Sequence, residues 1–318
     1  MKHCCVIGGA GFLGSHVVEA LHAKGELVTV IGRTPMPSRI LPKGVRYIPG
    51  DYGERAFLLG ALKGVDEIIN LAYSTVPSTS FDDPVQDIIS NLPAAVGLFD
   101  VASRLAIRKI VVISSGGTVY GPAQDVPILE AHPTNPISPY GVTKLAIEKY
   151  GLMFMKLKGL PVVTVRPANA FGEQQKPFTG QGFVATAMAS VLRGKDLFLY
   201  GDPGTIRDYI HVSDVATGIV AALELGKPGS VYNIGSGEGR SNKDILDAIY
   251  PFAQAAGLEP KVNILPSRQF DVEANILDSG KLKQETGWAA KVPFNVGIEQ
   301  TWNWFLRTML QTGALGSS

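Results

Sequence analysis

Short apolar, β-branched runs alternate with longer stretches of helical periodicity in the first half of the chain. The pattern predicts strands at His3–Ile7, Leu27–Ile31, Val45–Ile48, Asp66–Leu71, Lys109–Ser114 and Val162–Val165. It predicts helices at Phe12–Lys24, Val85–Leu105 and Pro139–Lys158. Strands that are apolar throughout are buried on both faces, and helical crossovers between them make them parallel. The sequence therefore predicts an α/β fold with a doubly wound parallel sheet.

After Arg166 the alternation becomes irregular, and glycine and proline are more frequent. We expect helices at Phe183–Leu192, His211–Glu224, Asp244–Ala256 and Phe294–Thr308, and strands at Leu197–Tyr200 and Val231–Ile234. Of these elements, the helix at His211–Glu224 and the strand at Val231–Ile234 fit a return of the chain to the main sheet. We therefore predict a sheet domain of residues 1–166 and 208–235, a smaller mixed α/β substrate lobe of residues 167–207 and 236–312, and a disordered tail at 313–318.

The composition excludes several classes of partner. Lysine plus arginine total 29 against 28 aspartate plus glutamate, so no basic field would gather nucleic acid or a membrane surface. No apolar run is long enough to span a bilayer, and the start lacks a signal-peptide layout. The only cysteines, Cys4 and Cys5, are adjacent, which indicates a reducing compartment, and we expect a cytoplasmic protein. The five histidines are scattered, so we expect no metal site.

A glycine-rich turn joins the first predicted strand to the first predicted helix, with the spacing G-x-x-G-x-x-G. Such a turn brings the backbone close to a pyrophosphate, and the helix N-terminus offers unpaired N–H groups with partial positive charge. The strand–turn–helix context favours dinucleotide binding in a Rossmann-type sheet over a tight turn without a ligand. The candidate cofactor contacts of this turn are Gly8, Gly11, Phe12, Leu13 and Gly14.

The end of the second strand leaves the phosphate state of the cofactor open. NAD-binding folds usually carry an acid there that holds the adenosine ribose, but this chain has Gly32. Arg33 suits a 2′-phosphate, which favours NADP, and it is equally compatible with stacking on adenine or facing water. The cofactor is therefore NAD or NADP. Asp51 is placed to accept a hydrogen bond from the adenine amino group, or it is a surface turn residue.

Tyr140 and Lys144 lie four residues apart, on one face of a predicted helix. A buried ammonium near a phenol favours the phenolate, which a general base requires. The preceding strand ends in Ser114 and Ser115, and Thr118 follows shortly. Hydroxyls at this carboxyl edge of the sheet face the crevice in which a nicotinamide would lie.

These motifs resemble the extended short-chain dehydrogenase/reductase family, and within it the nucleotide-sugar epimerases. The resemblance covers nearly the whole chain in order. The matching residues are Gly8, Gly11 and Gly14, Asn70-Leu71-Ala72, Asp83-Pro84, Asn91, Ser114-Ser115, Val119-Tyr120-Gly121, Ser138-Pro139-Tyr140-Gly141, Lys144, Arg166-Pro167, Asn169, Gly172, Arg207 to Val212, Asp214-Val215-Ala216, Asn233-Ile234-Gly235 and Gly287-Trp288.

The resemblance implies roles by position. Tyr140 would be the catalytic base and Lys144 its partner, and Ser115 or Thr118 would bond the sugar oxygen. Further cofactor contacts would be Tyr52, Leu71, Ala72, Tyr73, Asn91, Ser114 and Pro167. Substrate contacts would be Ser115, Gly116, Asn169, Arg207, Arg268 and Asn275. The two arginines would hold the diphosphate or uridine, the alternative being a structural ion pair.

The activity implied by the resemblance is 4-epimerisation of a UDP-hexose, either UDP-glucose and UDP-galactose or their N-acetyl forms, through a 4-keto sugar. The alternatives are another nucleotide-sugar reaction, as a reductase, decarboxylase or 4,6-dehydratase, and a non-enzymatic NAD(P)-binding protein. Dehydratases typically carry Asp-Glu where this chain has Gly117-Thr118, which disfavours that reaction. As in relatives, Val85–Leu105 and Pro139–Lys158 would pair across a two-fold axis in a homodimer.

Three positions depart from the pattern of the family. Gly116 stands where 4-epimerases usually carry serine or threonine, Gly32 replaces the ribose-binding acid, and Arg268-Gln269-Phe270-Asp271 replaces an Arg-x-Gly-Asp stretch. In addition, Asn275 stands where a tyrosine excludes N-acetylated sugars in some relatives. We therefore expect acetylated substrates to fit, unless Asn275 caps a turn away from the sugar.

Overall fold

The computed structural model describes residues 1–267 and 272–311, and its central element is a seven-stranded sheet in the order β10-β6-β5-β4-β1-β2-β3. Every neighbouring pair in this sheet is parallel. The strands are β1 (His3–Ile7), β2 (Leu27–Gly32), β3 (Arg46–Pro49), β4 (Glu67–Asn70), β5 (Lys109–Ile113), β6 (Val162–Pro167) and β10 (Val231–Ile234). The predicted doubly wound parallel sheet is confirmed.

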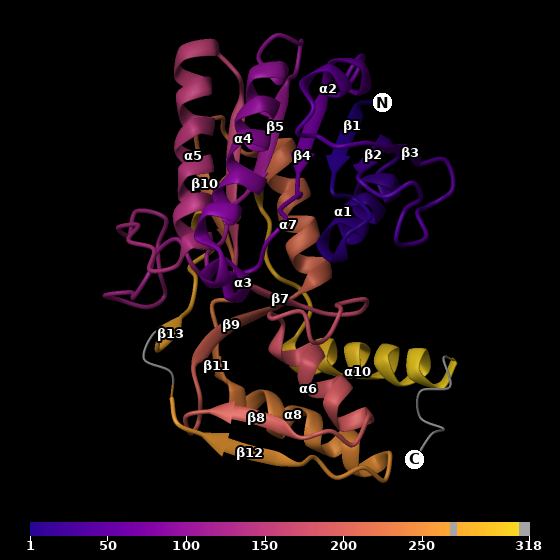
Figure 1. Cartoon of the computed structure of the whole chain (residues 1–318), viewed down its shortest axis with the longest axis vertical. Coiled ribbons are helices and arrows are strands. Elements are labelled where there is room, and N and C mark those ends of the chain that lie inside the picture. The colour runs from indigo at the N-terminus through magenta and orange to yellow at the C-terminus, as the bar shows by residue number, and fades with distance from the viewer. Residues whose placement is uncertain (268–271, 312–318) are drawn as a thin grey trace.

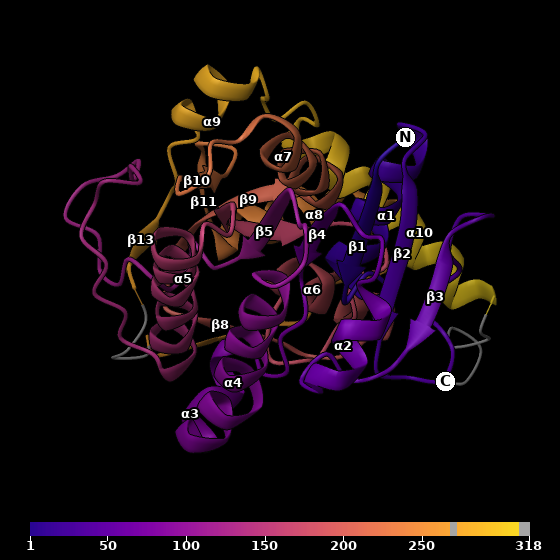
Figure 2. The ribbon, with the colours of Figure 1, turned by 90° about the horizontal axis from the view of Figure 1, so that it is seen from above.

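Helices cover both faces of the sheet, which is why its inner strands are apolar at nearly every position (Figure 2). On one face, α1 (Phe12–Ala23) and α7 (Val212–Leu225) share a buried core with the sheet. On the other face, a second core includes residues of α2 (Arg55–Ala61), α4 (Pro84–Ala102) and α5 (Pro139–Lys158). The short helix α3 (Pro77–Asp82) packs against α4 and α5.

A second group of elements lies below the carboxyl edge of the sheet in the view of Figure 1. Its buried core joins three helices, α6 (Phe183–Leu192), α8 (Asn242–Ala255) and α10 (Phe294–Gln311). The strands β8 (Leu197–Tyr200) and β12 (Val262–Leu265) form a parallel pair. The strand β9 (Ile206–His211) pairs with β11 (Gly239–Ser241), β13 (Ala274–Asn275) and β7 (Asn169–Phe171). A last helix, α9 (Gly280–Thr286), packs against α7 and β10.

The structure adds elements that the pattern did not predict, chiefly β7, β9, β11 and β13, because strands of two to six residues carry little periodicity. It also moves one boundary. His211 was predicted to begin a helix, but it is the last residue of β9, and its ring nitrogen accepts the Ser213 N–H at the start of α7. Residues 313–318, predicted to be a disordered tail, lie outside the described residues.

Candidate functional site

The predicted catalytic pair lies at the N-terminal end of α5, where Ser138 caps the helix by accepting the Gly141 N–H at 3.1 Å. The Tyr140 N–H donates to Ser80 Oγ of α3 at 3.2 Å. Lys144 is buried, and its Nζ donates to the carbonyl of Ile113, the last residue of β5, at 3.0 Å. The ammonium is therefore held at the carboxyl edge of the sheet.

Tyr73, which follows β4, joins the two side chains into a compact group. The centre of its ring lies 3.9 Å from Lys144 Nζ, and its ring meets that of Tyr140 edge-on with 4.9 Å between the centres. Lys144 Nζ also lies 5.5 Å from the centre of the Tyr140 ring. Cation–π attraction stabilises an ammonium in this position. The pair predicted from the sequence is thus a set of three contacting side chains.

Burial by protein atoms is the largest influence on the protonation of this group. Burial raises the pKa of Tyr140, Asp87 raises it further, and a hydrogen bond with Ser115 lowers it. Burial lowers the pKa of Lys144 to about 7, although Asp87 and Glu148 oppose that change. The expectation that Lys144 favours a Tyr140 phenolate is therefore offset by burial, which disfavours charge on both groups.

The turn that follows β5 brings further hydroxyl groups to this edge. The carbonyl of Ser115 accepts the N–H groups of Thr118 and Val119 at 3.3 and 3.1 Å, which closes the turn. Ser114 Oγ and Thr118 Oγ1 are buried and have no hydrogen-bond partner within residues 1–267 and 272–311. Because a buried hydroxyl without a partner is costly, these two oxygens suit a ligand that supplies the missing hydrogen bonds.

A buried ion pair between Arg166 and Glu148 lies next to the turn that follows β5. Arg166 donates to the Glu148 carboxylate from Nε at 2.9 Å and from Nη2 at 2.6 Å. The guanidinium also lies 4.8 Å from the centre of the Tyr120 ring, and the Tyr120 hydroxyl donates to Asn233 Oδ1 at 2.7 Å. The Val119-Tyr120-Gly121 and Arg166-Pro167 motifs therefore have a structural role, because their contacts hold the turn after β5 in place.

A cavity of about 280 Å³ lies beside the glycine-rich turn and is lined by many of the predicted cofactor contacts. These are Gly8, Gly11, Arg33, Tyr52, Leu71, Ala72 and Tyr73. A Cβ on Gly14 would lie 2.2 Å from the Gly8 carbonyl, and a Cβ on Gly8, whose φ is +80°, would lie 3.0 Å from Ala72 N. No side chain caps the first turn of α1, so its amides are left for an anion. This donor set fits the pyrophosphate of a dinucleotide.

The place of the missing ribose-binding acid is filled by Tyr47 of β3. A Cβ on Gly32 would lie 2.6 Å from the Tyr47 hydroxyl. That hydroxyl donates to the Thr34 carbonyl at 2.7 Å and lies 3.1 Å from Thr34 Oγ1. Packing therefore favours glycine at position 32, and Tyr47, Thr34 and Arg33 line the cavity instead. Hydroxyls with a guanidinium suit a ribose diol or a 2′-phosphate, so both cofactors fit.

Two predicted cofactor contacts have other partners. Asp51 is exposed, and its Oδ1 accepts the Gly53 N–H at 2.8 Å, so its contact with adenine stays a prediction. Asn91 is fully buried. Its Oδ1 accepts the Ser74 N–H at 2.7 Å, and its Nδ2 donates to Thr75 Oγ1 and the Asp87 carbonyl at 3.2 and 2.8 Å. All its amide groups are therefore used within the protein, and a direct cofactor contact of Asn91 stays a prediction.

The remaining predicted cofactor contacts do not line the cavity, and their roles stay predictions. These are Phe12, Leu13, Gly14, Ser114, Tyr140, Lys144 and Pro167.

Two predicted substrate contacts are enclosed by protein. Gly116 is buried, its N–H donates to the Pro167 carbonyl at 2.9 Å, and its own carbonyl accepts Asn275 Nδ2 at 3.1 Å. A Cβ at this position would lie 2.3 Å from Leu277 Cδ1, which explains the departure from serine or threonine. Asn275 is only 1 % exposed. Both residues thus lie behind the Ser115 turn, and Asn275 Oδ1 is buried without a hydrogen-bond partner among the described residues. Direct sugar contact by Gly116 or Asn275, and the effect of Asn275 on acetylated sugars, stay predictions.

The other predicted substrate contacts remain open to that role. Asn169 begins β7, and its Oδ1 lies 3.4 Å from the point where a Cβ on Gly117 would stand. Arg207 is half-buried on β9, in register with Asn275, and its Nη1 donates to the Ile206 carbonyl at 2.8 Å. Arg268 lies outside the described residues.

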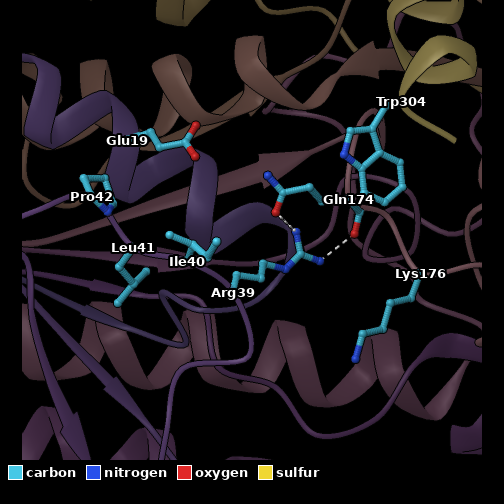
Figure 3. A pocket seen from close by; sticks show the side chains of 8 residues that line it. All are labelled: Glu19, Arg39, Ile40, Leu41, Pro42, Gln174, Lys176 and Trp304. Carbon is cyan, nitrogen blue, oxygen red and sulfur yellow. Dashed lines mark hydrogen bonds between the residues drawn. The ribbon is translucent and has the colours of Figure 1, made fainter. Parts of the chain in front are cut away.

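A larger cavity of about 610 Å³ lies away from these groups, between α1, the loop after β2, the segment after β7 and α10 (Figure 3). None of the predicted site residues that the structure describes lines it. Its lining is Glu19, Arg39, Ile40, Leu41, Pro42, Gln174, Lys176 and Trp304. Within it, Arg39 donates from Nη1 to Gln174 Oε1 at 2.7 Å and from Nη2 to the Gln174 carbonyl at 2.6 Å.

The sequence reasoning missed Asp87 and Thr75, which contact Asn91, and Tyr47, which lines the cavity beside Arg33. One signal for Asp87 was available, since it precedes Asn91 by four residues and so shares its helix face. Across residues 1–267 and 272–311, no group of His, Cys, Asp and Glu side chains is arranged to hold a metal ion. In the same part of the chain, no helix has the length and apolar character needed to cross a membrane.

Comparison with known proteins gives this arrangement a family. The model of the NAD dependent epimerase/dehydratase family matches residues 4–235. The chain is 33 % identical to the UDP-glucose 4-epimerase of Lacticaseibacillus casei, over 94 % of this chain and 95 % of that one. It is 28 % identical to a dTDP-glucose 4,6-dehydratase of an Actinoplanes species, over 94 % and 96 %.

A crystal structure of Thermus thermophilus UDP-glucose 4-epimerase in complex with NAD has the same fold. Its TM-score is 0.88 at 34 % identity, over 96 % of this chain and 99 % of that one. The family match covers the glycine-rich turn, the tyrosine–lysine pair and all of the parallel sheet except His3. On the geometry and the comparisons together, the chain belongs to the NAD-dependent epimerase/dehydratase family.

Proposed function

We propose that this chain is a nucleotide-sugar 4-epimerase that inverts C4 of a UDP-hexose, with NAD or NADP as its cofactor. The observation that carries the proposal is the meeting of Tyr140, Lys144 and Ser115 at the carboxyl edge of β5, beside Tyr73 of the cofactor cavity. The name of the L. casei relative supports the nucleotide and the sugar class.

In the proposed reaction, a bound nicotinamide supplies the acceptance and return of one hydride at the sugar C4. Tyr140 in its phenolate form accepts the proton of the 4-hydroxyl and later gives it back. The hydroxyls of Ser115 and Thr118 bond the sugar oxygen and orient it toward Tyr140. Lys144 holds positive charge beside the phenolate. The reaction has no net redox change, so the cofactor is not consumed.

The turn after β5 favours epimerisation over dehydration. Elimination of water from a 4-keto sugar needs an additional acid and base. The turn carries Gly117 and Thr118 where the family resemblance leads us to expect a carboxylate pair in dehydratases, and the Asp87 carboxylate near Tyr140 is fully buried. A 4-keto-6-deoxy product in the assay would therefore overturn both this argument and the epimerase assignment.

We also propose that the protein acts as a homodimer through α4 and α5. Large apolar side chains are exposed along these helices, namely Val85, Ile88 and Ile89 on α4 and Val142, Met153 and Leu157 on α5. Exposed apolar residues grouped on adjacent helices are typical of a protein–protein interface, and a two-fold axis would pair the helices of two copies.

The test is direct incubation with UDP-glucose, UDP-galactose and their N-acetyl forms, with and without added NAD or NADP, and NMR of the products. We expect interconversion of C4 epimers without net redox. Tyr140→Phe should abolish the interconversion while cofactor binding is retained. The assignment is falsified if the wild-type protein leaves every C4 centre unchanged or if Tyr140→Phe keeps full activity.

A further inference from the structure

A fully buried carboxylate lies next to the catalytic group without an ion-pair partner. Asp87 is 0 % exposed on α4. Its oxygens accept a short hydrogen bond from Thr75 Oγ1 and longer ones, at 3.4 Å each, from the Tyr73 hydroxyl. Within residues 1–267 and 272–311, no salt bridge of 4.0 Å or less involves it. A buried charge of this kind requires compensation by a nearby opposite charge.

Tyr73 connects this carboxylate to Lys144. Its hydroxyl end points at Asp87, and its ring lies against the Lys144 ammonium with Nζ 3.9 Å from the ring centre. A phenol that donates to an anion has a more electron-rich ring, which strengthens its attraction for a cation. The ring also contacts Tyr140 edge-on. The carboxylate, phenol and ammonium therefore form one polarised chain that ends at the catalytic pair.

Hydrogen bonds from α4 hold the main-chain segment that carries Tyr73 in place. Asn91 accepts the Ser74 N–H at 2.7 Å and donates to Thr75 Oγ1 at 3.2 Å. The same amide donates to the Asp87 carbonyl one helical turn earlier, at 2.8 Å. The segment 73–75 and the Asp87 carboxylate are thus held against each other by the fully buried Asn91.

We propose that Asp87 is a positioning residue that acts through Tyr73 to keep the Lys144 ammonium charged beside Tyr140. The inference rests on the proposed function and deepens it. It assigns the counter-charge of the catalytic lysine to a residue that touches neither sugar nor cofactor, since its side chain has no accessible surface.

The other charges that face Lys144 do not replace Asp87. Glu148 lies one turn along α5, but its carboxylate is held by Arg166 of β6 in a two-point ion pair. Burial raises the pKa of Tyr73 and of Tyr140, so neither brings a standing negative charge to Lys144, and the Tyr140 phenolate is confined to the proposed proton transfer. Asp87 opposes the loss of the Lys144 proton and also raises the Tyr140 pKa, so removing its charge should lower the pKa of both groups.

The test uses Asp87→Asn and NMR of the cofactor-free protein labelled at lysine 13Cε and tyrosine 13Cζ. Signals are assigned with Lys144→Met and Tyr140→Phe. We expect the titration midpoints of Lys144 and Tyr140 to fall by about one pH unit, the size of shift that a nearby charge produces. The pH profile of epimerisation should move to lower pH by a similar amount. Asp87→Glu, which keeps the charge, should restore the wild-type midpoints even if the rate falls.

The matched control is Asp83→Asn, which removes the same charge from the exposed N-cap of the same helix and should move neither midpoint. Unchanged midpoints in folded Asp87→Asn overturn the inference, as does a uniform loss of rate without a shift along the pH axis. If Asp87→Asn does not fold, Tyr73→Phe replaces it in the test, because it deletes the hydroxyl that connects Asp87 to Lys144. An unchanged Lys144 titration midpoint in Tyr73→Phe also overturns the inference. The titrations need no turnover, so they stand even if the wild-type protein epimerises no sugar.

Discussion

A side chain at position 116 should destabilise the protein, although the family resemblance led us to expect serine or threonine there. A Cβ on Gly116 would lie 2.3 Å from Leu277 Cδ1 and 3.1 Å from the carbonyls of Arg166 and Pro167. Leu277 is fully buried in a cluster with Val119, so it cannot swing aside. Overpacking of this kind costs about 1–3 kcal/mol, which corresponds to a fall in Tm of roughly 5 °C.

Urea unfolding of Gly116→Ala, Leu277→Ala and the double variant measures the clash directly. Leu277→Ala alone should cost about 2–5 kcal/mol because it leaves a cavity. In the double variant the new methyl group has room, so the combined cost should be at least about 1 kcal/mol below the sum. Gly117→Ala is the control, because its Cβ would have only Asn169 Oδ1 nearby, at 3.4 Å, and should be nearly neutral. Strict additivity, or full stability of Gly116→Ala, would refute the reasoning.

Three further outcomes are expected. Gly14→Ala should abolish NAD and NADP binding in calorimetry because its Cβ would meet the Gly8 carbonyl at 2.2 Å, whereas Gly60→Ala, with open space around it, should bind normally. Since the folded-state pKa of Lys144, about 7, is below its unfolded value, the unfolded chain binds more protons above pH 7. The free energy of unfolding of the wild type relative to Lys144→Met should therefore rise between pH 7 and pH 9, by at most about 1.4 kcal/mol per pH unit. Ile89→Glu should convert a dimer to a monomer in light scattering, and a wild type that is already monomeric would contradict the proposed interface.

The two variants that probe the cofactor turn and the lysine have their own contradicting results. Retained dinucleotide affinity in Gly14→Ala would mean that the turn can open without loss of the site. A wild-type stability difference from Lys144→Met that is flat or falls with rising pH would mean that the lysine keeps its proton throughout that range.

The sheet could be read from the sequence because its signal is long and repeated. Inner strands such as Lys109–Ile113 are apolar on both faces, and long periodic helices such as α1, α4 and α5 lie between several of them along the chain. The short strands around β9 could not be read in this way. Ala274–Asn275 is a strand only because it pairs with Ile206 and Arg207, and that pairing depends on contacts between distant parts of the chain.

In the site, too, some residues could be predicted from the sequence and others could not. Tyr140 and Lys144 were found because helical spacing and the preceding serines place them at one sheet edge, and the glycine-rich turn was found because its spacing has a steric cause. The burial of Asn91 and Asn275 could not be found, since a polar residue in a helix or short strand is more often at the surface. The role of Tyr47 was not predicted because its hydroxyl occupies the space that a side chain at Gly32 would fill, and only the pairing of β2 with β3 brings the two residues together.

The two hydrogen bonds from Arg39 to Gln174 join the loop after β2 to the segment after β7. The loop that carries Arg39 also supplies Thr34 and Ser38 to the rim of the dinucleotide cavity, and Gln174 follows β7. Any movement of the segment after β7 must either break both bonds or drag that rim with it. Arg39 and Gln174 therefore hold the part of the cavity rim that carries Thr34 and Ser38 to the segment that follows β7.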